Sequence, residues 1–188
     1  MENTPSRQEF DALKSAVNVL QAEADIRRIM GRYNMLCDVP LPEQGHDLES
    51  RIGVILELFS DDATWEGVGG AHEQQFGKSV GREQLTQHFR RFFGPGDKKM
   101  VLNVHYLTSE QIHVYGEDAD GQWVHFQPWV FDDGSSFLRS SRTNNNFKLV
   151  NGVWKMSHYR TENIFVAPLQ SGWATKMLTE TVLMKRQN

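Results

Sequence analysis

The chain has 188 residues, enough for one domain with a sizeable buried core and too few for two ordinary domains. Its 20 Lys and Arg residues against 24 Asp and Glu residues give a formal net charge of −4 without a basic cluster, so we expect neither nucleic acid nor an anionic membrane as partner. The single cysteine, Cys37, excludes an internal disulfide, and the N-terminal residues lack the pattern of a signal peptide. We therefore expect a soluble, cytoplasmic protein.

The first part of the chain predicts helices separated by loops. Apolar residues recur every three or four positions from Gln8 to Cys37, which predicts one long helix that breaks or frays near Gly31. Pro40 and Pro42 then favour a loop, because proline lacks an amide donor and restricts the residue before it. A second amphipathic helix is expected to run through Phe59.

The next elements are expected to be short. We predict a turn at 60–62, a strand that carries Trp65, a loop over 68–80, and a helix that ends at Gly94 and Pro95.

From Lys98 onward the sequence is typical of strands joined by tight turns. The predicted strands cover roughly 100–116, 120–132, 136–150 and 153–165. Asp120-Gly121 and Asn151-Gly152 predict type I′ turns because these residues accept positive φ angles, and Asp133-Gly134 is a third candidate. Helices followed by antiparallel strands indicate an α+β domain. A final amphipathic stretch at about 174–186 predicts a C-terminal helical extension.

One face of the second long strand combines aromatic and polar side chains. Alternation places Trp123, His125, Gln127, Trp129 and Phe131 on the same face. A plain core would be more aliphatic, whereas ligand pockets are mostly apolar with a few placed polar groups. The pattern favours a cavity here, and the alternative is an aromatic core in which His125 bonds a backbone carbonyl.

Five sequence blocks carry a resemblance to a known family. They are IRRIMGRYNMLCD, ELFSDDATWEG, GREQLTQHF, NVHYLTSEQIHV and LVNGVWKMSHYR, and they lie within about residues 20–165. In this order they resemble the SnoaL-like branch of the NTF2-like superfamily, which includes scytalone dehydratase, bile acid dehydratase and the small subunits of aromatic-ring dioxygenases. The resemblance implies a single domain over 1–188, a cone-shaped barrel whose strongly bent, mostly antiparallel sheet wraps three N-terminal helices around a deep pocket.

The resemblance also implies site residues. The tyrosine and aspartate of the bile acid dehydratase pattern fall on Tyr33 and Asp38, its histidine falls on His105, and a second pocket histidine of scytalone dehydratase matches His125. Ser141 matches a pocket serine. The resemblance implies a pocket without metal or cofactor, and none of the compact metal-ligand spacings occurs in the sequence.

The residue types support general base chemistry. Five helical residues sweep about 500°, so Tyr33 and Asp38 share a site only if the helix ends near Cys37. Asp38 would then orient His105 as a general base, while Tyr33 and His125 would bond a developing oxyanion or leaving hydroxyl. The alternatives are a solvated Asp38, histidines held in the core, and a Tyr33 ring that only packs against the sheet.

Several further side chains are candidates for substrate binding. Aromatic residues would supply shape and exclude water, and one arginine is a candidate that could equally point outward. The set consists of Trp65, Trp123, Trp129, Phe131, Ser141 and Arg142.

Together these features predict a cofactor-free lyase or isomerase for a small alicyclic, steroid-like or polyketide-like substrate, assembled as a homodimer or homotrimer. Two alternatives stay open, a noncatalytic dioxygenase small subunit and a protein that binds a hydrophobic ligand without chemistry.

Overall fold

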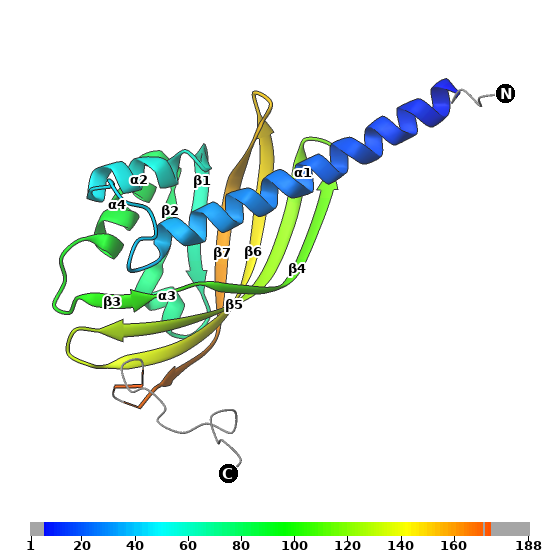
Figure 1. Ribbon diagram of the computed structural model, residues 1–188. Coiled ribbons are helices and arrows are strands. Elements are labelled where there is room, and N and C mark those ends of the chain that lie inside the picture. Colours follow the sequence, from blue (N-terminus) through cyan, green and yellow to red (C-terminus); the bar gives the residue numbers. More distant parts are fainter. Residues whose placement is uncertain (1–5, 171, 174–188) are drawn as a thin grey trace, which may run out of the picture.

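The computed structural model describes residues 6–170 and 172–173, which form a strongly curled sheet with helices on its concave side (Figure 1). The helices are α1 (Arg7–Cys37), α2 (Leu48–Leu56), α3 (Ala71–Phe76) and α4 (Gly81–Phe93). The strands are β1 (Phe59–Val68), β2 (Lys78–Val80), β3 (Met100–Asn103), β4 (Tyr106–Tyr115), β5 (Asp118–Phe131), β6 (Ser136–Val150) and β7 (Val153–Pro168). The helix predicted at 174–186 lies outside the described residues.

The strand order confirms the predicted α+β fold with a bent, mostly antiparallel sheet. The order is β2-β1-β7-β6-β5-β3, and β4 pairs with the other half of β5. β1 and β7 run parallel, whereas the other paired strands are antiparallel. In Figure 1, α1 crosses in front of the central strands while α2 and α4 close one end of the curl. No described helix is long and apolar enough to cross a membrane.

Helix α1 is continuous, so the break predicted near Gly31 is wrong. Its start is fixed by a capping box in which the Ser6 side chain and the Glu9 side chain bond each other's backbone amide. Its second half buries Ile26, Met30 and other apolar residues in the core. Burial of this kind outweighs the cost of one helical glycine, which is about 1 kcal/mol.

The segment after α2 becomes strand earlier than predicted. α2 ends at Leu56, and β1 already starts at Phe59, so residues 60–62 belong to a strand and form no turn. The strand buries Phe59, Ala63 and Trp65. This burial holds β1 in the core, so the segment does not turn at 60–62. The region predicted as a loop over 68–80 contains the short helix α3 and the edge strand β2.

The hairpin turns agree with the prediction at one position and differ at another. Asn151 and Gly152 both have positive φ angles, 52° and 78°, as the type I′ prediction requires. The turn between β4 and β5 lies instead at Gly116, where φ is 69°. Gly121 lies within β5, opposite Asn145, and the Trp123 ring occupies the space beside its Cα atom. This close approach explains the glycine better than a turn does.

Replacing Gly121 by Ala should therefore destabilise the protein. An added Cβ would lie 2.5 Å from atoms of the Trp123 ring, and the displacement should lower the free energy of unfolding by about 1–3 kcal/mol. Gly53→Ala in α2 is the matched control, because its Cβ meets nothing within 4 Å and should stabilise the helix by about 0.5–1 kcal/mol. Urea denaturation of both variants checks the pair, and equal stabilities would contradict the packing described.

Candidate active site

The site begins where α1 ends. The helix stops at Cys37, and Asp38 has an extended backbone with φ −72° and ψ 152°. The next residue, Val39, exchanges two backbone hydrogen bonds of 2.8 Å with Asn103 at the end of β3. This small bridge ties the end of the helix to the strand region that carries His105.

Arg51 of α2 caps the same helix end. Its Nε donates to the Leu36 carbonyl at 2.6 Å and its Nη2 donates to the Asp38 carbonyl at 3.0 Å. The guanidinium also stacks over the Phe93 ring at 3.8 Å. A cation satisfies the free carbonyls and the negative end of the helix dipole, which would otherwise disfavour a carboxylate at this place.

The structure brings Asp38 and His105 into direct contact. Asp38 Oδ1 lies 2.7 Å from His105 Nδ1 and also accepts a hydrogen bond of 3.0 Å from the His105 backbone amide. The two side chains are 16% and 9% exposed. One carboxylate oxygen therefore holds both the backbone and the ring of the histidine.

A chain of buried amides fixes the other edge of the His105 ring. Asn103 Nδ2 donates to the Cys37 carbonyl at 3.1 Å, which leaves Asn103 Oδ1 to accept from Gln127 Nε2 at 2.7 Å. The same Gln127 Nε2 lies 2.9 Å from His105 Nε2. Because an amide nitrogen only donates, His105 Nε2 must be the acceptor and Nδ1 must carry the proton toward Asp38. The contacts thus select one neutral tautomer.

A cavity lies beside this histidine. Its walls come from α1, α3, α4 and several strands, and its lining includes His105, His125 and Gln127. The lining residues enclose about 450 Å³ of space when the open mouth is included. The centre of a water-sized sphere can move through about 50 Å³ of it. The smaller number measures the free room and suffices for a few waters, so a ring-sized ligand requires side chains to move. The aromatic part of the wall consists of Trp65, Phe76, Phe89, Phe92, Trp129 and Tyr159.

Some of the predicted binding residues line this cavity and others do not. Trp65 and Trp129 do, whereas Trp123 packs against Phe147 and donates from its indole nitrogen to Glu110 at 3.1 Å. Phe131 is also outside the lining, and its ring makes edge contacts with Trp129 and Phe137 at the C-terminal end of β5. β5 has 14 residues and spans about 45 Å, so residues on one face cannot all reach one cavity.

The two predicted residues of β6 are likewise outside the lining. Ser141 is buried opposite His125 but does not reach the cavity wall. Arg142 follows it on the other face of the strand and is exposed, which agrees with the alternative that its side chain points outward.

Tyr33 lies inside the cavity wall as a neutral phenol. It is buried, and its hydroxyl accepts a hydrogen bond of 2.8 Å from the indole nitrogen of Trp65. Burial raises the pKa of Tyr33 well above its ordinary value. The Trp65 ring in turn stacks on Tyr159 with 5.4 Å between centroids. Trp65 therefore orients the phenol in addition to forming part of the wall.

Two charged or titratable residues of the cavity were not predicted as site residues. Arg139 of β6 is 2% exposed, and its guanidinium stacks over the Trp129 ring at 3.8 Å. Burial lowers the pKa of Arg139 to about 10, so it remains a cation at neutral pH. His88 of α4 packs on Trp65 with 4.1 Å between ring centroids, and burial lowers its pKa to about 4. Alternation along β6 places Arg139 on the inward face of the strand, and this was the sequence signal that could have identified it.

The polarity of the cavity follows from these groups. Its described lining contains the Arg139 guanidinium, imidazoles and hydroxyls but no Asp or Glu side chain. Among the described residues, no three His, Cys, Asp or Glu side chains form a cluster that could hold a metal ion. The environment therefore favours a group that carries or develops negative charge.

The family of the chain follows from a sequence comparison. The family model of the SnoaL-like domain matches residues 18–160, and the chain belongs to this family. No curated protein matches the chain at a significant level.

Solved structures show the same cone-shaped, cystatin-like fold. Hexachlorocyclohexane dehydrochlorinase (LinA) Type2 has a TM-score of 0.64 and 20% identity, covering 80% of this chain and 90% of that one. A Novosphingobium aromaticivorans protein assigned as an aromatic ring hydroxylase has a TM-score of 0.62 and 20% identity, covering 80% and 94%. Another from the same species, assigned as a scytalone dehydratase, has a TM-score of 0.61 and 13% identity, covering 80% and 89%. At these identities the likeness shows the fold.

The buried His88 should make the protein sensitive to mild acid. The folded state resists protonation down to about pH 4, whereas the unfolded chain takes up the proton near pH 6.5, so stability falls as the pH drops below 6.5. Between pH 7 and pH 5 the free energy of unfolding should fall by about 2 kcal/mol through this group.

Denaturation of wild type and His88→Gln at both pH values measures this contribution. The variant should lose less stability between pH 7 and pH 5 than the wild type does. His113→Gln, at an exposed position, controls for the loss of a histidine. Equal pH dependence in wild type and His88→Gln would contradict a buried neutral imidazole.

Proposed function

We propose that this protein is a cofactor-free lyase or isomerase in which His105 removes a proton from a carbon atom of a small cyclic substrate. The observation that carries the proposal is the 2.7 Å contact between Asp38 Oδ1 and His105 Nδ1 at the edge of a largely aromatic cavity. An acid that accepts from Nδ1 leaves the Nε2 lone pair as the base and stabilises the imidazolium formed by proton uptake.

The proton balance of the proposed step is simple. His105 Nε2 takes a proton from a ring carbon next to a carbonyl, and the C–H electron pair forms an enolate or a new double bond. In an elimination, a hydroxyl or halide on the neighbouring carbon leaves with its bonding electrons. A leaving hydroxyl takes the proton back from His105 Nε2 and departs as water, whereas an isomerisation returns this proton to another carbon.

Negative charge that develops in this step would meet positive and hydrogen-bonding groups. Arg139 is a buried cation in the wall, and Tyr33 is a phenol that stays protonated. His125 has its ring centroid 5.8 Å from that of His105. A fixed cation and oriented donors in a site that excludes water stabilise an oxyanion or a leaving anion without reorganisation.

Gln127 has a positioning role in this proposal. In the resting site its amide nitrogen donates to the lone pair of His105 Nε2. A substrate C–H group must take the place of this amide before the base can remove a proton. Asn103 holds the amide in the donating orientation because its own nitrogen is bound to the Cys37 carbonyl. A displaced Gln127 N–H can then donate to the oxygen that gains charge.

The proposal predicts base-dependent exchange of carbon-bound hydrogen. Cyclic ketones with a hydroxyl or chloride at the β carbon, incubated in D₂O, should gain deuterium at the α carbon or lose the leaving group with wild-type protein. His105→Ala and Asp38→Asn should lower this rate by about 10²–10⁴-fold. NMR spectroscopy and mass spectrometry of the ketones measure both outcomes, and His113→Gln serves as the control.

The same experiment separates catalysis from the alternatives. Wild-type rates in His105→Ala would contradict the proposed base. Saturable binding of a ketone with no exchange in wild type would indicate a ligand carrier, and a requirement for a larger oxygenase partner would indicate a noncatalytic subunit.

Removing the Gln127 amide should loosen the base without removing it. In Gln127→Met we expect exchange rates to fall about 10–100-fold, because the ring loses the contact at Nε2. Nitrogen-15 NMR of the His105 ring should show one Nδ1–H tautomer in the wild type and exchange-broadened signals in the variant. Gln122→Met, on the exposed face of the same strand, is the matched control. An unchanged His105 spectrum in Gln127→Met would refute the positioning role.

A further inference from the structure

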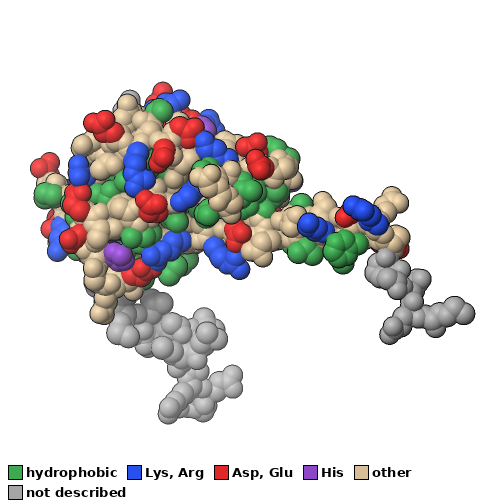
Figure 2. Space-filling view, turned by 90° about the horizontal axis from the view of Figure 1, so that it is seen from above, with side chains coloured by type: hydrophobic (Ala, Val, Ile, Leu, Met, Phe, Trp, Pro, Cys, Tyr) green, Lys and Arg blue, Asp and Glu red, His purple; other side chains and the backbone are tan. Residues whose placement is uncertain are grey.

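The N-terminal half of α1 projects from the body of the molecule as an arm (Figures 1 and 2). Residues 6–21 are exposed on all sides, yet large apolar side chains occur among them at regular intervals. Figure 2 shows hydrophobic side chains gathered on the projecting helix. We call four of these side chains the arm stripe: Phe10, Leu13, Val17 and Leu20, which are 59%, 64%, 54% and 63% exposed.

The arm stripe faces away from the body. Leu13 and Ala22 are nine positions apart, which turns the helix by about 900° and places them on opposite sides of it. Ala22 is the first buried residue of α1 and marks the side that packs on the sheet. The side with the arm stripe is therefore open to another molecule without obstruction by the chain's own sheet.

The spacing of the arm stripe is that of a coiled coil. The intervals of three, four and three residues define a heptad with Phe10 and Val17 at position a and Leu13 and Leu20 at position d. Ala24 continues the series at position a. Val17 at position a, with Leu13 and Leu20 at position d, is the combination of a β-branched residue and leucine that favours a parallel pair of helices. The pattern thus points to a second copy of the same helix as the partner.

The charges beside the arm stripe agree with parallel pairing. Positions g and e′ approach each other in a parallel pair, which would bring Glu9 to the partner's Lys14, a pair of opposite charges within the arm. An antiparallel pair would instead place e beside e′ and g beside g′, where Lys14 would not meet Glu9.

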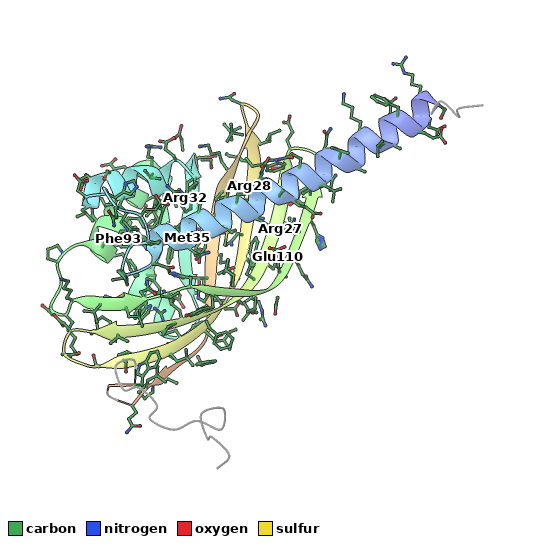
Figure 3. The ribbon with its side chains drawn as sticks, viewed as in Figure 1. Arg27, Arg28, Arg32, Met35, Phe93 and Glu110 are labelled. Atoms are coloured by element: carbon green, nitrogen blue, oxygen red, sulfur yellow. The ribbon has the colours of Figure 1, made fainter. Side chains whose placement is uncertain are left out.

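The coiled coil would end where α1 reaches the body. Arg27, at the next d position, donates to Glu110 on β4 at 2.6 Å and to Glu23 at 3.0 Å (Figure 3). A residue held in this way is not available as a core residue of a helix pair. The paired region therefore covers the arm alone, and each cavity stays within its own subunit.

We propose that the protein is a homodimer held by parallel, in-register pairing of the arm stripes. The pairing buries side chains that are otherwise more than half exposed, and it places the two bodies on opposite outer sides of the helix pair. This inference does not depend on the proposed reaction.

The oligomeric state of the full chain tests the proposal. Light scattering after size exclusion should give a dimer for the wild type and a monomer for Leu13→Glu/Leu20→Glu, with the dissociation constant raised at least 100-fold. Ala12→Glu/Ser15→Glu is the matched control, because it adds the same charge to exposed positions on the other side of the arm and should stay dimeric. Circular dichroism verifies that each variant is folded.

Cysteine cross-linking tests the orientation. The sequence has a single cysteine, Cys37, which is buried. Leu13→Cys therefore introduces the one accessible thiol. In-register parallel helices bring the two copies of residue 13 together, and oxidation should yield a disulfide-linked dimer. Ala12→Cys should cross-link far less.

Three results would overturn the proposal. They are a monomeric wild type, a dimer that persists in Leu13→Glu/Leu20→Glu, and a dimer that depends on the arm stripe but does not cross-link through Leu13→Cys.

Discussion

One carboxylate oxygen holds the functional part of this molecule together. Asp38 Oδ1 accepts hydrogen bonds from both the backbone amide and the ring of His105, so the end of α1 and the start of β4 cannot move independently. Hydrogen bonds to a charged group contribute about 1.5–3 kcal/mol each. The same bonds that hold the strand region to the helix therefore set the orientation of the base.

This arrangement requires a carboxylate at an electrostatically unfavourable place, and α2 supplies the compensation. The Arg51 guanidinium binds two carbonyls at the helix end and lies beside the negative end of the dipole. Burial lowers the pKa of Arg51, but the group is still a cation at neutral pH. α2 thus acts on the site through charge and hydrogen bonds, although it contributes no residue to the cavity lining.

The fold and the approach of Asp38 to His105 were predictable from the sequence through its resemblance to the SnoaL-like family, and local signals agree with both. The prolines after Cys37 end the helix, and the alternation in β5 identifies its inward face. The place of Trp123 outside the cavity was not predictable in this way, since it depends on where along a long, curled strand the cavity lies. The role of Gly121 was not predictable either, since it depends on the approach of the Trp123 ring. Asn103 was missed because its role comes from contacts with Cys37 and Gln127, far away in the sequence, whereas Arg139 was missed although the alternation along β6 indicated it.

The distribution of the site over the chain has a consequence for folding. Asp38 and His105 are 67 positions apart, and Asn103 and Cys37 are 66 apart. Contacts of such long range cost loop entropy and form only when most of the chain has adopted its final topology. A partly folded chain, with its helices formed and its sheet incomplete, therefore contains no oriented base. Formation of the hydrogen bond between Asp38 and His105 would therefore indicate that the whole domain has folded.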